Sequence, residues 1–130
     1  MIDHVDLVVT DLGRSLHFYR ELLAPLGYDR LSPITGERGE RVVYVSHPDG
    51  DAIGLREVQS PGAVDRYALG LHHLALRCPS REVVDERAAF LRATGADVES
   101  GPAEYDYSPG YYAVFFRDPD GLKLELLHQP

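Results

Sequence analysis

The chain has 130 residues, of which 44% are hydrophobic and 26% charged, as expected of one compact globular domain with a substantial core. Its formal net charge of −8 argues against nucleic acid or an anionic membrane surface as a partner. No apolar stretch approaches the ~20 residues that span a bilayer, and the first residues lack the pattern of a signal peptide, so the expected location is the cytoplasm.

The first half begins with an alternating strand followed by an amphipathic helix. Residues 3–9 alternate so that His4 lies on one face of the strand and Leu7 on the other. Apolar side chains then recur at helical spacing over residues 12–23, which predicts a helix with one face against a sheet. Gly27 is the expected end of this helix.

Three further strands are expected in the first half. Residues 40–46 and 52–58 are typical of two strands joined by a His-Pro-Asp-Gly-Asp turn. A strand near residues 29–34 would take an edge position, because Pro33 has no backbone N–H to donate to a neighbour. The order of elements in this half is therefore β-α-β-β-β.

The second half repeats this order. A strand is expected at residues 71–78, a helix at 80–94 and a short strand at 96–100. Residues 111–117 and 122–127 then form a hairpin about an Asp-Pro-Asp-Gly turn. The chain consists of one module written twice, and such a repeat indicates the whole fold.

The repeat predicts a single α+β domain made of two tandem βαβββ modules. The modules are residues 1–58 and 71–130, and the linker between them is residues 59–70. One helix on a small four-stranded sheet is too thin to be stable alone, so the two modules are expected to share a core. Their sheets would then form a cup-shaped mixed sheet with the helices outside.

Residues able to bind a metal recur with the repeat. His4 and His73 are 69 residues apart, and Glu57 and Glu125 are 68 apart. Glu125 lies among leucines, where an unpaired charge would be unfavourable unless a cation sat beside it. Two histidines and one carboxylate form an open facial triad that suits Fe(II), Zn, Mn, Ni or Co. His72 competes with His73, but the alternation turns its side chain to the opposite face.

The position of Glu57 is ambiguous from the sequence. The Pro-Asp-Gly turn ends seven residues before Glu57 but only four before Glu125. Either the first turn is longer, or Arg56 or Gly54 occupies the position equivalent to Glu125. Glu57 is accordingly a fourth ligand or a mobile general base only under the first alternative.

Tyrosines and arginines are the other candidate ligand contacts. Four tyrosines crowd residues 104–112, and their apolar rings with polar tips suit closure over a small ligand. Packing within a loop or at a subunit contact is the alternative. An arginine can bind an anionic substrate through two hydrogen bonds, or it can pair with the many acidic side chains. The candidate substrate contacts are Tyr105, Tyr107, Tyr112, Arg56 and Arg77.

The sequence resembles the vicinal oxygen chelate superfamily, which includes glyoxalase I, extradiol dioxygenases, fosfomycin-resistance transferases and bleomycin-binding proteins. The resemblance covers nearly the whole chain. It rests on the opening His4-Val with Asp11-Leu…Ser15-Leu-His-Phe-Tyr, on His73-Leu-Ala-Leu-Arg, and on Asp118-Pro-Asp-Gly-Leu-Lys-Leu-Glu-Leu.

The resemblance implies a divalent metal held by paired βαβββ modules, a substrate bound through adjacent oxygens, and a homodimer. His4, His73 and Glu125 match the ligand positions of the family, and Glu57 matches the fourth position of glyoxalase-like members.

Two functions of different kinds follow from these observations. The first is a metal-dependent lyase, isomerase or dioxygenase acting on a small oxygenated substrate, in which Glu57 or Glu125 moves the proton. The second is a binding protein of the bleomycin-resistance type, which sequesters a drug or metabolite without a metal. A purely structural dimer partner is a third possibility, and it would show no thermal shift with small molecules.

Overall fold

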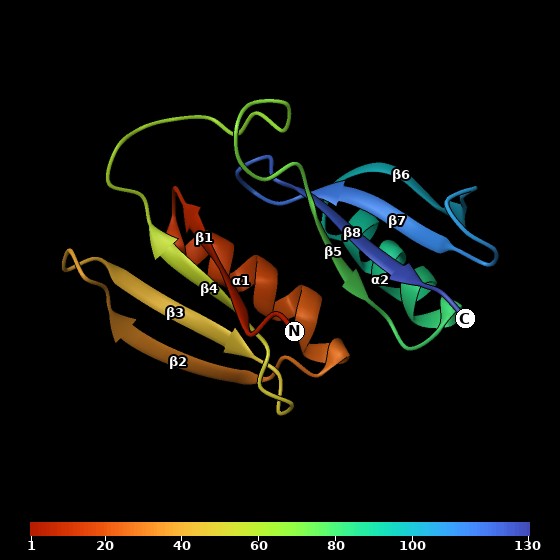
Figure 1. The fold of residues 1–130 in the computed structure, drawn as a ribbon, viewed down its shortest axis with the longest axis horizontal. Coiled ribbons are helices and arrows are strands. Elements are labelled where there is room, and N and C mark those ends of the chain that lie inside the picture. Colours follow the sequence, from red (N-terminus) through yellow and green to blue (C-terminus); the bar gives the residue numbers. More distant parts are fainter. The chain divides into compact units, whose positions relative to one another are not determined.

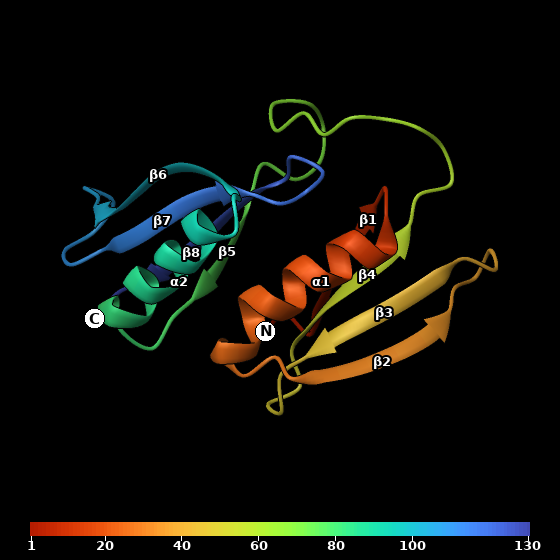
Figure 2. The same ribbon diagram turned by 180° about the vertical axis from the view of Figure 1, so that it is seen from behind.

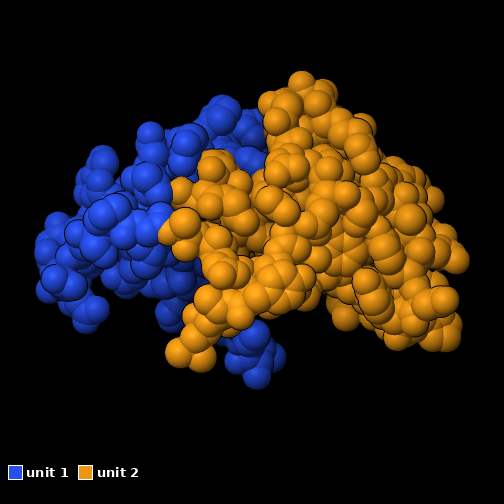
Figure 3. All heavy atoms as spheres, turned by 90° about the horizontal axis from the view of Figure 1, so that it is seen from above, with its two compact units in different colours: residues 1–62 blue, residues 63–130 orange.

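The computed structural model describes all residues 1–130 and divides into two compact units, residues 1–62 and 63–130 (Figure 3). Each unit contains a four-stranded mixed sheet and one helix of three turns or more. The α+β class and the duplicated βαβββ order are therefore confirmed. Neither helix has the length and apolar character that crossing a membrane requires.

Unit 1 has its sheet in the strand order β1-β4-β3-β2, with β1 parallel to β4 and the other neighbours antiparallel (Figure 1). The Asp11 carboxylate caps the helix by accepting a hydrogen bond from the backbone N–H of Arg14 at 3.1 Å. The strand that contains Pro33 lies at the edge, as the proline predicts. The elements are β1 (His4–Val9), α1 (Leu12–Leu23), the 3₁₀-helix η1 (Ala24–Leu26), β2 (Arg30–Thr35), β3 (Arg41–Ser46) and β4 (Ala52–Glu57).

Unit 2 repeats the topology in the order β5-β8-β7-β6, with β5 parallel to β8. Its first strand is shorter than the alternation predicts, because regular pairing begins only at Leu74. His72 and His73 consequently lie just before the strand, with His72 in a bend. The elements are β5 (Leu74–Arg77), α2 (Arg81–Ala93), β6 (Asp97–Glu104), β7 (Tyr112–Arg117) and β8 (Lys123–His128).

Each sheet has one face covered by the helix of its own unit and one face that this helix does not cover, here called the helix-free face. Figure 2 shows α1 lying along the sheet of unit 1 and α2 along the sheet of unit 2. Strand alternation sends buried aliphatic side chains such as Leu55 and Leu124 towards the helices. The candidate site residues His4 and Glu125 lie on the helix-free faces.

The strand register decides which residue of unit 1 is equivalent to Glu125. Ala75 pairs with Glu125 in unit 2, and Asp6 pairs with Gly54 in unit 1. Asp6 and Ala75 are separated by the same 69 residues as the two repeated histidines. Gly54 is therefore the residue of unit 1 that is equivalent to Glu125. Of the alternatives that the sequence left open, the structure shows the one in which Gly54 occupies this position.

Gly54 is required by the side chains packed above it. A Cβ atom at this position would lie 2.4 Å from Oδ1 of Asp6 and 2.6 Å from Cε1 of Tyr44. We expect Gly54→Ala to lower the free energy of unfolding by about 1–3 kcal/mol, measured by urea denaturation. Gly62→Ala is the control, because nothing lies within 4 Å of its Cβ position. Equal losses in the two variants would contradict this account of the packing.

Candidate functional site

His73 and Glu125 meet on the helix-free face of unit 2. Nε2 of His73 lies 3.2 Å from Oε2 of Glu125. The pairing of β8 with β5 and β7 sets the carboxylate between Ala75 and Phe115, so that Glu125 is only 2% exposed. An almost fully buried carboxylate with an imidazole beside it is an arrangement that favours a cation or proton between the two groups.

The other oxygen of Glu125 is held by Tyr111. The Tyr111 hydroxyl donates a hydrogen bond to Oε1 of Glu125. Burial, together with this hydrogen bond, raises the pKa of Tyr111 above its usual range, so the phenol keeps its proton and acts as a donor. Tyr111 thereby fixes the orientation of the carboxylate and leaves Oε2 directed at His73.

The sequence predicts Tyr112, and not Tyr111, as a substrate contact. The structure places Tyr112 on the helix-covered face, where its hydroxyl donates to Oδ1 of Asp85 at 2.5 Å and its ring lies 4.8 Å from Arg81 Cζ. Tyr112 is thus separated from Glu125 by the sheet. The signal was present in the sequence, because Tyr112 alternates in phase with the buried Phe116.

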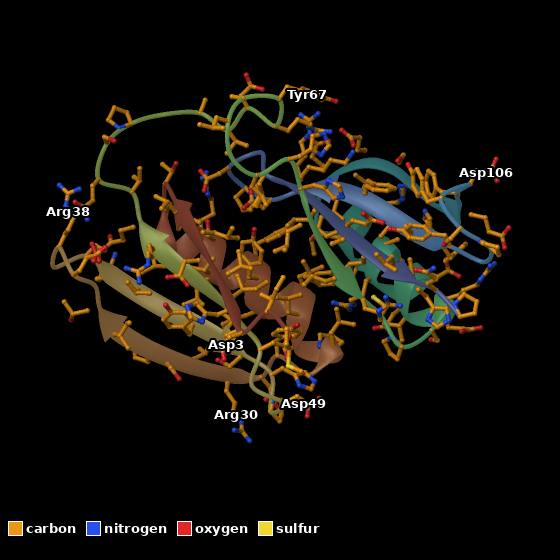
Figure 4. The ribbon with its side chains drawn as sticks, in the orientation of Figure 1. Asp3, Arg30, Arg38, Asp49, Tyr67 and Asp106 are labelled. Carbon is orange, nitrogen blue, oxygen red and sulfur yellow. The ribbon has the colours of Figure 1, made fainter.

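Two of the predicted tyrosines do lie near Glu125, in a set of rings here called the aromatic group: Tyr105, Tyr107, Tyr111 and Phe115. Tyr105 and Tyr107 are stacked with centroids 5.6 Å apart, and Tyr107 meets Tyr111 edge-on at 5.2 Å. Tyr105 also meets Phe115 at 5.2 Å, and Phe115 is the strand partner of Glu125. Asp106 marks the turn between β6 and β7 that carries Tyr105 and Tyr107 (Figure 4).

Arg77 and Arg56 have different surroundings. Arg77 pairs in register with Leu127, shares a face with Glu125 and is exposed. Its charge also acts on Tyr111, where it opposes the rise in pKa. Arg77 is therefore placed to meet an anionic group near the carboxylate, whereas Arg56 is occupied by acidic partners.

Arg56 joins two carboxylates on the helix-free face of unit 1. Its Nε donates to Oδ2 of Asp6 at 2.6 Å, and its Nη1 donates to Oε1 of Glu40 at 3.2 Å. Tyr44 donates to the same Asp6 oxygen at 2.9 Å, while the buried Oδ1 of Asp6 has no hydrogen-bond partner. The hydrogen bond to Asp6 is the main cause that raises the pKa of Arg56. The salt-bridge alternative considered for Arg56 is the one that the structure shows.

His4 begins β1 on the same face as Asp6. Its Nδ1 lies 2.6 Å from Oδ1 of Asp3, and this hydrogen bond raises the pKa of His4. The edge of its ring meets Tyr44 with centroids 5.6 Å apart. Because Nδ1 is engaged by Asp3 (labelled in Figure 4), Nε2 is the nitrogen that His4 can offer to a metal.

The structure does not bring Glu57 to His4. The register pairs His4 with Ala52 and Glu57 with Val9, five positions further along, or about 16 Å at ~3.3 Å per residue. Glu57 also has the opposite parity and lies on the helix-covered face.

Glu57 is instead bound by Arg41. The guanidinium of Arg41 donates to both carboxylate oxygens, at 2.8 and 2.9 Å, and lowers the pKa of Glu57. The assignment of Glu57 as a fourth ligand or general base is thus replaced by a surface ion pair. Of the residues of unit 1 predicted as ligands, His4 lies on the helix-free face.

His72 touches His73 directly. The two Nδ1 atoms are 2.8 Å apart, and the ring centroids are 5.0 Å apart. The sequence placed the two side chains on opposite faces, but the bend before Leu74 brings them to one side. Desolvation and the neighbouring His73 lower the pKa of His72, which favours its neutral form.

The segment before His72 is tied to the sheet of unit 2. Arg66 donates to Glu99 of β6 at 2.8 Å, and Lys123 and Arg117 bind the same carboxylate at 3.1 and 3.3 Å. These cations, Arg66 foremost, lower the pKa of Glu99 to about 2. The next residue, Tyr67 (Figure 4), places its ring 5.2 Å from that of His72. The ion pairs of Glu99 with Arg66, Lys123 and Arg117 are here called the clamp. The clamp holds this segment next to His72 and His73.

The donor atoms in unit 2 therefore suit a divalent cation, although no three histidine, cysteine or carboxylate side chains gather as a complete site. The imidazole nitrogen of His73 and the carboxylate of Glu125 are donors that Fe, Zn, Ni, Mn and Co all accept. Oriented by Tyr111, the carboxylate has one oxygen available for such an ion.

Two units that each combine a four-stranded mixed sheet with one helix make the fold that solved glyoxalase-type structures share with this chain. The chain belongs to the Glyoxalase/Bleomycin resistance protein/Dioxygenase superfamily, whose family model matches residues 1–126.

The chain is similar to several known proteins over almost its whole length. It is 30% identical to the uncharacterized protein YqjT of Bacillus subtilis (strain 168), covering 95% of each chain. It is 31% identical to the lactoylglutathione lyase of Escherichia coli O157:H7, covering 97% of this chain and 90% of that one. A solved glyoxylase/bleomycin resistance protein/dioxygenase domain from Frankia sp. EAN1pec has a TM-score of 0.81 and 28% identity, with coverage of 100% and 98%.

Proposed function

We propose that the protein is a metal-dependent enzyme acting on a small substrate that binds the metal through adjacent oxygens, and that His73, Glu125 and His4 are the metal ligands. The observation that carries this proposal is the buried Glu125 carboxylate facing Nε2 of His73 at 3.2 Å. A buried carboxylate is unfavourable in an apolar surrounding unless a partner neutralises it. A divalent ion bound by both groups supplies that partner.

The ligand set contains two histidines and one carboxylate, because Gly54 occupies the position that could have supplied a second glutamate. Three protein ligands leave coordination positions for two substrate oxygens, where a bound metal acts as a Lewis acid. This favours dioxygenase-like or thiol-transfer chemistry over an isomerisation that needs a second glutamate. His4 comes from unit 1 of the same chain or of a second copy in a homodimer.

The other residues of unit 2 have roles towards the substrate. Tyr111 orients Glu125 and keeps its own proton. Arg77 is placed to bind an anionic group, and the half-buried Tyr105 with the exposed Tyr107 gives a surface for an apolar portion. The similarity to a lactoylglutathione lyase supports a small oxygenated substrate.

Metal binding by the purified protein tests the proposal. We expect wild-type protein, stripped with a chelator and dialysed against Zn²⁺ or Co²⁺, to take up one ion per ligand set. His4→Ala should bind roughly a hundredfold more weakly, since even outer-shell changes weaken metal sites about 10–100-fold. Glu57→Gln is the control and should bind as wild type does, because Glu57 lies on the other face of its sheet. Equal binding by wild type and His4→Ala would refute this ligand set.

A metal-free binding protein is the second candidate, and the aromatic group favours it. Tyr107 is 66% exposed and stacks on Tyr105, as expected of a surface that receives a flat ligand. In this case wild-type protein would take up no metal. A small molecule, such as a bleomycin-type drug, would then raise the melting temperature equally with and without chelator.

A further inference from the structure

We propose that His72 is a positioning residue, which pairs with Nδ1 of His73 as donor or as acceptor, and that the two imidazoles exchange tautomers when a cation enters between His73 and Glu125. The inference rests on the proposed function, because it concerns the same metal ligand. It starts from two contacts of the His73 ring: Nδ1 to His72 at 2.8 Å and Nε2 to Glu125 at 3.2 Å.

The two contacts of the His73 ring determine one arrangement of protons. An ionised carboxylate only accepts hydrogen bonds, so the contact with Glu125 requires the proton of neutral His73 to be on Nε2. Nδ1 of His73 then carries a lone pair. The Nδ1–Nδ1 contact needs one proton, and His72 must supply it as the donor. The chain of donors runs from His72 through His73 to Glu125.

With a cation held by His73 and Glu125, this chain of donors would run in the opposite direction. Metal binding requires a lone pair on Nε2 of His73, so the proton of the neutral ring moves to Nδ1. Nδ1–H of His73 then donates to Nδ1 of His72, whose own proton moves to its Nε2. Each ring holds one proton before and after, so the pair neither takes up nor releases a proton. Residue 72 must therefore donate in one state and accept in the other.

The surroundings of His72 hold it in place for this role. The ring of Tyr67 meets it at 5.2 Å, and the preceding Arg66 is bound to Glu99 at 2.8 Å. Glu99 is bound in turn by Lys123, two residues before Glu125 on the same strand. The clamp consequently connects the segment that carries His72 to the strand that carries the carboxylate.

The test compares two substitutions of His72 by Zn²⁺ titration. His72→Phe neither donates nor accepts, and we expect its Zn²⁺ affinity to fall about tenfold or more, as for other outer-shell partners of a metal ligand. His72→Asn can donate or accept through its amide and should retain affinity close to that of wild type. His17→Phe makes the same chemical change on an exposed position of α1 and serves as the control.

Nitrogen-15 NMR of the histidine rings gives a readout independent of activity. In wild type we expect Nε2 of His73 to be protonated without metal and Nδ1 to be protonated with Zn²⁺, with the opposite change at His72. Unchanged Zn²⁺ affinity in His72→Phe, or Nδ1 of His73 protonated in both states, would overturn the role of His72 alone. Absence of Zn²⁺ binding by wild type would overturn the proposed function and the exchange with it.

Discussion

Replacing Glu125 with glutamine is expected to weaken Zn²⁺ binding by roughly a hundredfold or more, with little change in the stability of the metal-free protein. The amide removes the negative charge that the ion requires, and a ligand has a larger effect than the outer-shell groups worth about 10–100-fold. Glutamine nevertheless fits the same space. Its Oε1 can still accept from Tyr111, and its Nε2 can donate to His73.

Zn²⁺ affinity and stability are expected to respond differently to this substitution because Glu125 is buried. Removing a desolvated charge offsets much of what the lost charge-assisted hydrogen bonds contributed, so we expect the free energy of unfolding in chelator to stay within about 1 kcal/mol of wild type. Urea denaturation and Zn²⁺ titration of the same preparation measure the two quantities. Glu57→Gln is the matched control, with Zn²⁺ affinity unchanged. A Glu125→Gln variant that binds Zn²⁺ normally would show a purely structural carboxylate, and one that loses several kcal/mol would contradict the expected small change in stability.

The repeat in the sequence predicts much of this site for a physical reason. Equal offsets along two copies of one module place equivalent residues at equivalent positions of two sheets, and alternation assigns their faces. His73 and Glu125 needed only these two rules to be placed on one face of unit 2.

Strand register is the property that the sequence did not determine. Glu57 is three residues from Gly54, an odd number, so its side chain emerges from the opposite face of the sheet. Its offset of 68 from Glu125 resembled the repeat, but the true offset on this strand is 71, the value shared by the two Pro-Asp-Gly turns. Gly54 and Glu125 each lie four residues after the turn of their hairpin, whereas Glu57 lies seven residues after its turn and is not the equivalent residue.

Contacts made outside regular strands were also beyond the alternation rule. His72 meets His73 because pairing of β5 begins at Leu74, and the rule fails where the backbone bends.

The acidic partners of Arg56 come from positions 50 and 16 residues away, and the sequence offered many acidic candidates. Such partners follow from the fold and not from local pattern.

Replacing Arg56 with alanine is expected to lower the free energy of unfolding more than replacing any other charged residue of unit 1. The substitution leaves Asp6 and Glu40 without their cation, and the Glu40 side chain is only 7% exposed. Breaking a buried ion pair from one side is more damaging than never having formed it, because the remaining charge stays desolvated. Because the Arg56 side chain is 26% exposed, the loss is expected to be smaller than for a fully buried ion pair.

Arg41→Ala is the matched control, since Arg41 also binds a carboxylate through two hydrogen bonds in the same sheet but is 72% exposed. We expect it to change the urea unfolding free energy much less than Arg56→Ala does, because exposed ion pairs contribute little to stability. A double variant, Asp6→Asn with Arg56→Ala, removes one of the two stranded charges and should recover part of the loss. If the double variant is no more stable than Arg56→Ala alone, the loss comes from packing of the arginine side chain and not from buried charge.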